Sequence, residues 1–281
     1  MDLKVQVLLF ITPLLVGLGI ILTFQSINLS KSNLIFCDVG QGDGILITSG
    51  SKQAVVDGGP GEKILECLSS NMPFWDRDLE LVIMTHPQRD HMEGLLAVLE
   101  RYRVKTIVVT GVGNNTGLYK AWEEAVGKEK AQMHIAQAGE RFAISRGLSL
   151  DVLWPSFAKV TQWQAEPPSD LNETSIVMRL EWGRPSTSSG SARCAYLTGD
   201  LPKEHLEPLI DRSCEILKVS HHGSKTGTSK AVLDLAQPKA AIIQVGKNSF
   251  GHPHKEVVDL LISKGIKILR NDTDGTIRIG K

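Results

Sequence analysis

Four short runs in this chain have the composition of buried strands, and each leads into a turn or loop that contains histidine or aspartate. They cover residues 81–84, 194–198, 216–220 and 240–245. A turn at the end of a buried strand holds its side chains in fixed directions at the edge of the sheet. Four strand ends of this kind predict one cleft, built by a fold that brings distant parts of the chain together.

The rest of the chain alternates short strands with helices in two successive rounds. Such an order predicts an α/β fold of two packed sheets with helices outside. The 281 residues, 42% of them hydrophobic, suffice for one large domain or two tightly joined halves. The polar stretch 183–193 lies between two strand-like runs and predicts a hairpin tip. The expected strands are 34–38, 44–48, 53–57, 79–85, 105–110, 143–153, 174–182, 194–198, 216–220, 240–245, 266–270 and 276–279, and the expected helices are 62–70, 93–101, 118–127, 202–212, 229–235 and 255–264.

The charges balance over the whole chain but not along it. Basic and acidic residues number 31 each, which is unlike a general nucleic-acid coat protein. Residues 213–281 nevertheless hold eleven Lys or Arg against six Asp or Glu. This modest excess suits an anionic substrate, although the lysines of 255–264 could equally be a solvated helix face.

Residues 5–24 form an uncharged apolar run near the N-terminus. In a helix this run would span about 30 Å, the thickness of a bilayer's hydrocarbon core. We expect an uncleaved membrane anchor, with a cleaved signal peptide as the alternative. Lys4 precedes the run and the next positive charge is Lys31, which favours a cytoplasmic N-terminus and an exported domain. The predicted organisation is an anchor and linker over residues 1–32 and a globular domain over residues 33–281.

The four cysteines are scattered. Cys37, Cys67, Cys194 and Cys214 form no C-x-x-C pair, so zinc-ribbon and thioredoxin interpretations have no support. Disulfides in an exported domain stay open, but buried free thiols are the expectation.

The strongest chemical motif is Thr-His-Pro-Gln-Arg-Asp-His at 85–91. It places His86, Asp90 and His91 directly after an apolar strand. Imidazole and carboxylate together suit Zn, Mn or Fe. Polar residues that merely cap the following helix are the alternative, and three potential metal ligands within six residues argue against it.

Three further motifs have the same form. Asp200 ends the run LTGD, where an N-cap role would also be ordinary. His221 and His222 begin the loop HHGSK, and GKNSFGHPH at 246–254 contains His252 and His254. Together with 85–91, these motifs predict a metal-dependent active site.

With these motifs the chain resembles the metallo-β-lactamase superfamily, and most closely the C-terminal hydrolase domain of ComEC-type DNA-uptake proteins. The resemblance covers nearly everything from residue 34 to residue 281, in the family's order. It rests on DVGQGD at 38–43, VVDGG at 55–59, THPQRDHMEG at 85–94, NETSIVMRL at 172–180, LTGD at 197–200, KVSHHGSKT at 218–226 and GKNSFGHPH at 246–254. The resemblance implies a four-layer αββα metallo-β-lactamase sandwich.

The resemblance also implies a set of metal ligands. His86 would belong to a first metal site, and Asp90 and His91 to a second. Asp200 would bridge the two metals, and His221 would complete the second site. Asp200, Asp90 and His254 are the catalytic residues that the resemblance implies.

Other residues would support these ligands or bind substrate. Asp57 would stand behind a ligand histidine and fix its tautomer, and Asp43 would also lie in the outer shell. His254 and Ser224 would face a substrate phosphate, and Lys225 or Lys247 would offset its charge. The residues expected to bind substrate are Ser224, Lys225, His222, Lys247 and Asn172.

Two positions depart from the family pattern. The usual motif H-x-H-x-D-H has Gln88 in place of its second histidine, and a glutamine amide is a poor metal ligand. The family's later histidine falls in the region of Asn172. We therefore expect one well-held divalent ion, Zn or Mn, and a second site that is weak or absent.

The expected activity is metal-assisted hydrolysis of a phosphodiester, with DNA as the substrate. The expected partners are DNA, a membrane reached through residues 5–24 and a separate channel protein. Three alternatives stay open: hydrolysis of another phosphoester, such as phosphocholine on a cell-wall polymer; hydrolysis of an acyl or thioester bond, which the HHGS and GHPH motifs favour less; and a degenerate domain that only binds DNA or a partner.

Overall fold

Two mixed sheets form the centre of the molecule. The computed structural model describes residue 12, residues 32–182 and residues 193–280, and within these residues each sheet has seven strands. The first sheet has the order β14 (Ile277–Gly280), β1 (Ser32–Phe36), β2 (Gly44–Ser49), β3 (Lys52–Gly58), β4 (Asp78–Ile83), β5 (Arg103–Val109) and β6 (Gln132–Ile135). The second has the order β13 (Lys267–Arg270), β12 (Ala240–Ile243), β11 (Ile216–Lys218), β10 (Arg193–Leu197), β9 (Val177–Trp182), β8 (Leu148–Trp154) and β7 (Arg141–Ser145).

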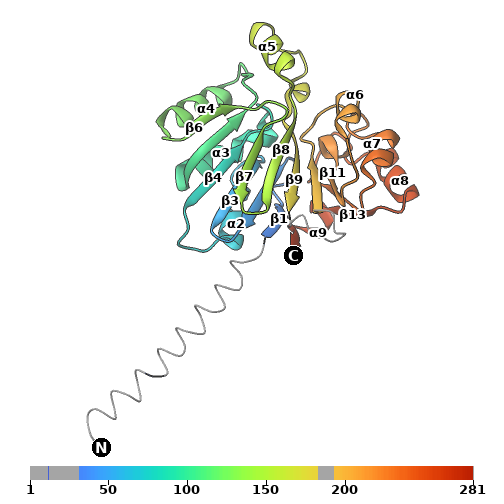
Figure 1. The fold of residues 1–281 in the computed structure, drawn as a ribbon, viewed down its shortest axis with the longest axis horizontal. Helices are drawn as coiled ribbons and strands as arrows, with labels where there is room; N and C mark the ends of the chain where they lie inside the picture. The colour runs from blue at the N-terminus through green and yellow to red at the C-terminus, as the bar shows by residue number, and fades with distance from the viewer. Residues whose placement is uncertain (1–11, 13–31, 183–192, 281) are drawn as a thin grey trace, which may run out of the picture.

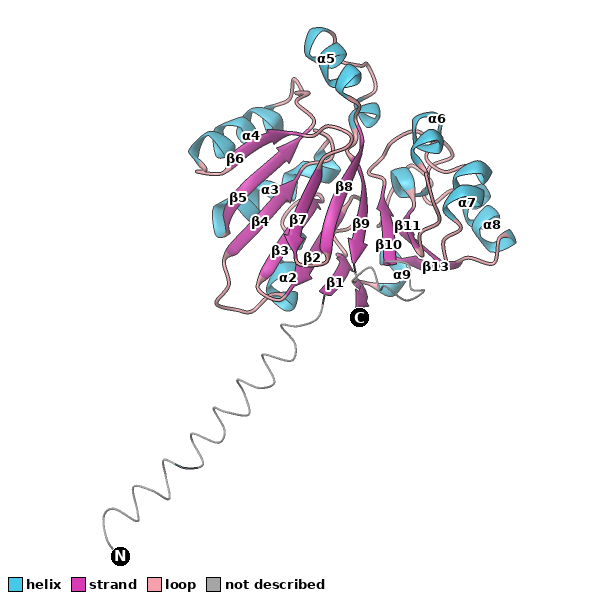
Figure 2. Ribbon diagram, in the orientation of Figure 1, coloured by secondary structure: helices cyan, strands magenta, loops and turns pink. Residues whose placement is uncertain are grey.

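Helices cover the outer face of each sheet (Figure 1). The first sheet packs against α2 (Lys63–Asn71), α3 (Arg89–Arg101) and α4 (Gly117–Lys128). The second packs against α6 (Lys203–Leu206), α7 (Lys230–Ala236) and α8 (Lys255–Ser263). Figure 2 shows the two sheets between these two groups of helices. The expected four-layer αββα arrangement is confirmed.

The apolar strands contribute side chains to two hydrophobic cores, one on each face of the sheet. Ile45 and Ile47 of β2 belong to the core between the sheets, and Leu46 belongs to the core under the helices. Leu81 and Val82 of β4 divide in the same way. Successive side chains of a strand point to opposite faces, so a strand that is buried on both faces is apolar throughout. This explains the continuous apolar runs of the sequence.

Several predicted elements differ in detail. The strand expected over 143–153 is a hairpin of β7 and β8, which turns at Gly147, where φ is +83°. The helix expected over 202–212 is the short α6 followed by the 3-10 turn η2 (Glu207–Leu209). Strand β6 and helix α5 (Phe157–Ala165) were not predicted. Two small elements complete the described part: η1 (Leu171–Thr174) and α9 (Asn271–Asp274).

The membrane anchor expected at residues 5–24 lies outside the described residues, as does the hairpin tip at 183–192. None of the helices in the described part of the chain combines the length and the apolar character that a bilayer crossing needs. Strands β9 and β10, on either side of the hairpin tip, pair antiparallel from Trp182 and Arg193 inward.

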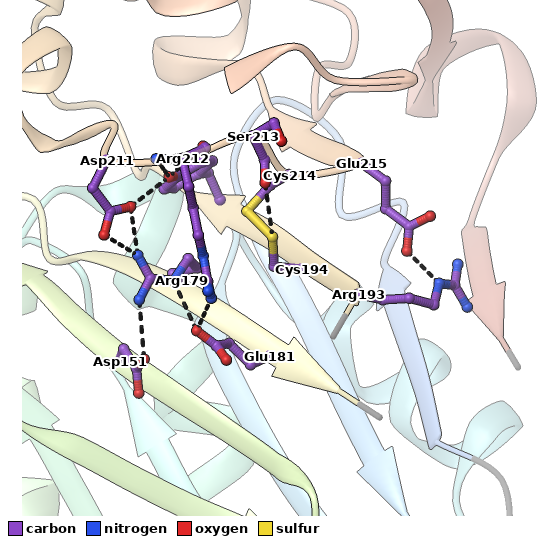
Figure 3. The surroundings of a disulfide bond; sticks show 11 residues. Asp151, Arg179, Glu181, Arg193, Cys194, Asp211, Arg212, Ser213, Cys214 and Glu215 are labelled. Atoms are coloured by element: carbon purple, nitrogen blue, oxygen red, sulfur yellow. Dashed lines mark hydrogen bonds and ion pairs between the residues drawn. A yellow bond between two sulfur atoms is a disulfide. The ribbon is translucent and has the colours of Figure 1, made fainter. Parts of the chain in front are cut away.

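The expectation of free thiols is wrong. Cys37 is bonded to Cys67 of α2, and Cys194 of β10 is bonded to Cys214, just before β11 (Figure 3). The Cα–Cα distances of 5.8 and 4.9 Å lie in the usual range for disulfides. The partners are 30 and 20 residues apart, a spacing that carries no local signal, so only the fold reveals the pairing.

Candidate metal centre

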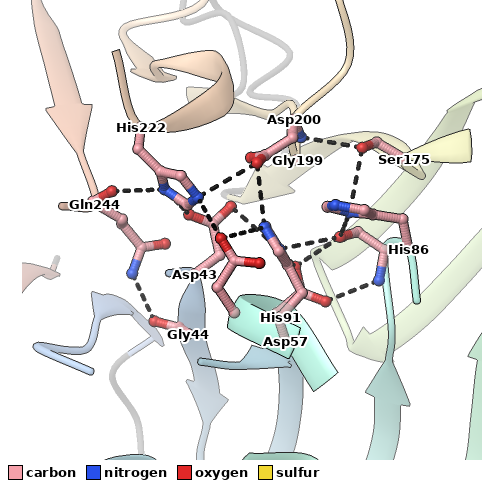
Figure 4. Close-up of polar contacts among 12 residues, drawn as sticks. Asp43, Gly44, Asp57, His86, His91, Ser175, Gly199, Asp200, His222 and Gln244 are labelled. Carbon is pink, nitrogen blue, oxygen red and sulfur yellow. Dashed lines mark hydrogen bonds and ion pairs between the residues drawn. The ribbon is translucent and has the colours of Figure 1, made fainter. Parts of the chain in front are cut away.

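The candidate site lies where loops from both sheets meet. Asp57 comes from the end of β3, His86 follows β4, and His91 lies in the first turn of α3. From the second sheet, Asp200 follows β10 and His222 follows β11. Figure 4 shows these side chains converging between the two sheets. The single cleft expected from the strand ends is therefore present.

Glycines allow the backbone segments to approach closely enough to form the site. A Cβ on Gly94 of α3 would lie 2.1 Å from the carbonyl oxygen of Gly58, so only glycine lets α3 pack against the end of β3. A Cβ on Gly42 would lie 2.2 Å from the carbonyl oxygen of Asp90. The amide of Asp43 donates to that same carbonyl at 3.1 Å. These contacts hold the DVGQGD loop against the start of α3.

The two adjacent histidines lie in a strained turn, η3 (Ser220–Gly223). His221 and His222 have φ values of 51° and 52°, in the left-handed region that side chains with a Cβ seldom adopt. Strain of this kind persists where surrounding structure imposes it, and it is concentrated at functional sites. Here the turn directs the His222 ring into the site.

Four side chains converge at the centre of the site: Asp90, His91, Asp200 and His222. Their ligand atoms all lie within 4.8 Å of one another. Asp200 Oδ2 lies 3.2 Å from His91 Nε2 and 3.3 Å from His222 Nε2. Asp90 Oδ2 lies 3.3 Å from His222 Nε2 and 3.9 Å from His91 Nε2. None of these short distances has hydrogen-bonding geometry at the two Nε2 atoms.

Outer contacts fix the orientation of both histidine rings. Nδ1 of His91 lies 2.8 Å from Asp57 Oδ2, and Nδ1 of His222 lies 2.8 Å from the carbonyl oxygen of Gln244. Each Nδ1 therefore carries the proton and donates it to its oxygen partner. Asp57 is itself held by the amide and hydroxyl of Thr85, at 2.8 and 2.7 Å. This leaves each Nε2 directed at the carboxylates, where it can bind a metal ion in place of a proton, as in metal-bound histidine.

A buried lysine, Lys218, contacts one oxygen of Asp200 and leaves the other free to face the histidines. Its side chain is fully buried, and its Nζ donates to the carbonyl oxygen of Gly199 at 2.8 Å. The ammonium forms an ion pair with Asp43 and lies 3.4 Å from Asp200 Oδ1. Asp200 Oδ2 is thereby left to face the two histidines. The sequence pattern did not predict this role of Lys218.

The charges in the site are unbalanced without a cation. Four carboxylates face one ammonium group in the site: Asp43 and Asp200 lie against Lys218, and Asp57 and Asp90 lie against His91. Burial lowers the pKa of His91, but the charges of Asp200 and Asp57 outweigh it and raise that pKa well above its ordinary value. Burial likewise lowers the pKa of His222, and the charge of Asp200 and bonds to nearby carboxylates raise it well above its ordinary value. A histidine ring holds a proton in such surroundings unless a metal ion takes its place.

A divalent cation fits these donors. Two imidazole nitrogens and two carboxylate groups form a set that suits Zn or Mn. The Nε2 atoms of His91 and His222 are buried and have no hydrogen-bond partner. An unpartnered buried polar atom is costly unless a ligand satisfies it. The donor set and these unpartnered atoms therefore indicate a metal centre.

His86 lies beside this group and not within it. Its ring centroid is 4.1 Å from that of His91, and its Nδ1 lies 3.1 Å from the Thr85 hydroxyl and 3.3 Å from the Ser175 hydroxyl. Burial, and then the neighbouring His91, lower the pKa of His86 to about 3, so the ring is neutral at pH 7. Its Nε2 and the Oδ1 atom of Asn172 are buried without hydrogen-bond partners. Among the described residues, no cluster of three or more His, Cys, Asp or Glu ligand atoms includes His86.

His221 and His222 exchange the positions expected from the sequence. His221 was assigned to the metal, yet its Nε2 lies 3.9 Å from Asp200 Oδ2 and the residue is outside the compact ligand group. His222, which was assigned to substrate, is the histidine of this pair that lies in the compact group. A pair of adjacent histidines in a sequence does not reveal which ring the turn directs inward.

The other residues expected to bind substrate lie farther out. Ser224 contacts the Thr226 hydroxyl at 3.0 Å, and Lys225 forms an exposed ion pair with Glu256 at 2.9 Å. Lys247 is exposed on the loop after β12. His254 is the N-cap residue of α8, with its amide bonded to the carbonyl oxygen of Gly223 at 3.0 Å.

A cleft of about 530 Å³ opens over the metal centre. His252 lines it, a residue to which sequence analysis gave no role, and burial together with His221 lowers the pKa of His252 to about 4. The full lining is Gln41, Pro60, Gln88, Arg89, Asp90, His221, His222, Phe250 and His252. Ser224, Lys225, Lys247, Asn172 and His254 are not part of this lining.

Comparison with solved structures identifies the class of fold. YhfI from Bacillus subtilis, a metallo-β-lactamase fold protein, superimposes with a TM-score of 0.57, covering 88% of this chain and 100% of its own, at 13% sequence identity. This chain therefore has the metallo-β-lactamase fold.

The relatives found by sequence belong to one family. The chain is 29% identical to ComE operon protein 3 of Bacillus subtilis, over 89% of this chain and 33% of that protein. It is 26% identical to the competence protein ComA of Neisseria gonorrhoeae, over 86% of this chain and 31% of that protein. These are homologues of the ComEC family, and the chain spans about a third of their length. No family model matches the chain.

Proposed function

We propose that this chain is a metal-dependent phosphodiesterase that hydrolyses DNA. The observation that carries the proposal is the metal centre, in which the unpartnered Nε2 atoms of His91 and His222 face two carboxylates under an open cleft. Two further points support DNA. Relatives of the chain include a competence protein and a recombination protein. Arg89, whose guanidinium also pairs with Glu93 at 2.9 and 3.1 Å, lines the cleft, where it would meet an anionic substrate.

The ligand set consists of Asp90, His91, Asp200 and His222. When bound, a divalent metal would polarise a phosphoryl oxygen and lower the pKa of its bound water towards neutrality. Asp57 and the Gln244 carbonyl keep the Nε2 lone pairs of both histidines available. Lys218 holds Asp200 in one orientation by pairing with Oδ1, so Oδ2 stays in the centre. Arg89 and His252 line the cleft where the substrate phosphate would enter.

The test is cleavage of labelled single-stranded DNA by the full chain, stripped of metal and reloaded with Mn or Zn. Cleavage should need the metal and should fall at least about 100-fold in Asp200→Asn, because that change removes a charged ligand. The control is Asp259→Asn on the exposed face of α8, whose carboxylate pairs only with Lys255 at 2.5 Å and which should cleave normally. A folded, metal-loaded chain that leaves DNA intact would favour another phosphoester, such as phosphocholine, or a binding role.

We also propose that the domain lies outside the cytoplasm, attached to a membrane through residues 5–24. The two disulfides support this location, because such bonds persist in oxidising compartments. We propose a separate channel protein as a further partner.

A further inference from the structure

Phe250 is an exposed aromatic residue at the mouth of the metal cleft. Its side chain is 67% exposed, although it is large and apolar. The described residues expose eight large hydrophobic side chains, and among them Phe250 is the one that lines this cleft. The cleft also contains Asp90 and His222 of the metal centre. A molecule that reaches the metal centre through this cleft therefore passes the Phe250 ring.

The loop around Phe250 is held in a fixed shape. Asn248 Oδ1 accepts the amides of Phe250 and His252, both at 3.0 Å. Asn248 Nδ2 donates to the carbonyl oxygens of Gly246 and His252, at 2.9 and 2.8 Å. One side chain thus closes the loop with four hydrogen bonds. The exposure of Phe250 is consequently a property of an ordered loop.

The surroundings of the ring combine apolar and charged groups. Phe250 lies against His252, with ring centroids 5.8 Å apart and the planes tilted by 33°. Arg89 lines the same cleft; its side chain is 75% exposed, and its guanidinium pairs with Glu93 at 2.9 and 3.1 Å. Aromatic rings stack on nucleobases, and guanidinium groups bind phosphate. The two groups together match the two halves of a nucleotide.

We propose, on the basis of the function proposed above, that Phe250 is a stacking platform for a nucleobase of single-stranded nucleic acid. Every base has an aromatic face, so the contact is tolerant of sequence. A base paired within a duplex is already stacked and is not free to bind the ring. The structure thus assigns to Phe250 a preference for single strands and for substrates that carry bases next to the cleaved phosphate.

The test compares Phe250→Ala, Phe250→Trp and the control Phe74→Ala in the metal-loaded full chain. Phe74 is 79% exposed and precedes β4, the strand whose opposite end leads to His86. We expect Phe250→Ala to raise KM for a single-stranded oligonucleotide about tenfold with kcat within about threefold. Phe250→Trp should restore KM, and Phe74→Ala should change neither constant. An abasic oligonucleotide should be cleaved equally by wild type and Phe250→Ala.

A binding measurement separates this inference from the proposed activity. An oligonucleotide containing 2-aminopurine loses fluorescence when its base stacks on an aromatic ring. Binding of the probe to the Asp200→Asn variant should quench its fluorescence. The double variant Asp200→Asn/Phe250→Ala should bind without this quenching. Equal quenching with and without Phe250, or equal KM values for wild type and Phe250→Ala, would overturn the stacking role. If the wild type does not cleave DNA but the Asp200→Asn variant still quenches the probe, only the nuclease proposal is overturned.

Discussion

At the scale of single residues, the chemistry depends on each side chain giving its different polar atoms to different partners. Asp200 directs Oδ1 to Lys218 at 3.4 Å and Oδ2 to the two histidines at 3.2 and 3.3 Å. Each histidine in turn gives Nδ1 to an oxygen acceptor and keeps Nε2 for the centre. A buried group with one fixed partner per atom cannot rotate to satisfy another. The site is therefore preorganised for a cation.

The neighbouring histidines provide a residue-scale prediction. His222→Ala removes a ligand and should weaken Zn affinity by at least about 100-fold, since even outer contacts of metal ligands contribute 10- to 100-fold. His221→Ala is the matched change one residue earlier in the same turn, and its affinity should stay within about threefold of wild type. Competition with a fluorescent chelator measures both. The reverse order of effects would return the ligand role to His221.

At the scale of elements, a charged network ties three adjacent strands of the second sheet together (Figure 3). Arg179 of β9 bonds both oxygens of Asp211, at 2.5 and 2.6 Å, and Glu181 at 3.0 Å. Its other nitrogen reaches Asp151 of β8 at 3.3 Å. The Tyr196 hydroxyl of β10 donates to Asp211 at 2.9 Å. Three adjacent strands are thus linked through one guanidinium.

This network predicts a pH dependence of stability. Burial raises the pKa of Asp211, but the bonds from Arg179 and Tyr196 outweigh it, so the pKa lies below the ordinary 3.8. A lowered pKa means that the stabilisation is present above pH 3.8 and is lost as pH falls through the folded-state value. Asp211→Asn should therefore lower the urea midpoint at pH 7, and the difference from wild type should shrink below pH 3.8.

The control for this prediction is Asp259→Asn, which removes a carboxylate from the exposed face of α8 instead of from the network. Its urea midpoint should follow that of wild type at every pH. A gap between wild type and Asp211→Asn that stays constant down to pH 3 would show that the carboxylate charge is not the source of the stabilisation.

At the scale of the whole molecule, the two disulfides lie in different halves. Cys37–Cys67 joins the first sheet to α2, and Cys194–Cys214 joins β10 to the segment before β11. Cross-links that close loops of these lengths restrict the unfolded chain and stabilise the fold by about 3–4 kcal/mol each. Both halves of the site therefore rest on cross-linked scaffolds.

The disulfides predict the behaviour of the thiols. Full chain isolated from its native membrane under denaturing, non-reducing conditions should give no reaction with maleimide, and four labelled cysteines after reduction. Cys194→Ser/Cys214→Ser should unfold at a lower temperature than wild type. Four reactive thiols before reduction would contradict both the pairing and the proposed oxidising compartment.

Much of this architecture was predictable from the sequence because it depends on local patterns. Apolar runs gave the strands, and the His and Asp residues at strand ends gave the convergence of Asp90, His91 and Asp200. Other features depend on tertiary contacts and carry no local signal. The left-handed turn that selects His222 over His221 is one, and the burial of Lys218 against Asp43 is another.

The most direct test of the metal centre is anomalous X-ray scattering from Zn-loaded crystals of the full chain, recorded on both sides of the Zn absorption edge. The structure predicts one strong peak coordinated by Asp90, His91, Asp200 and His222, with weaker or no density beside His86. A strong peak held by His221 instead, an equal second peak at His86, or no peak among these four side chains would contradict the metal centre described above.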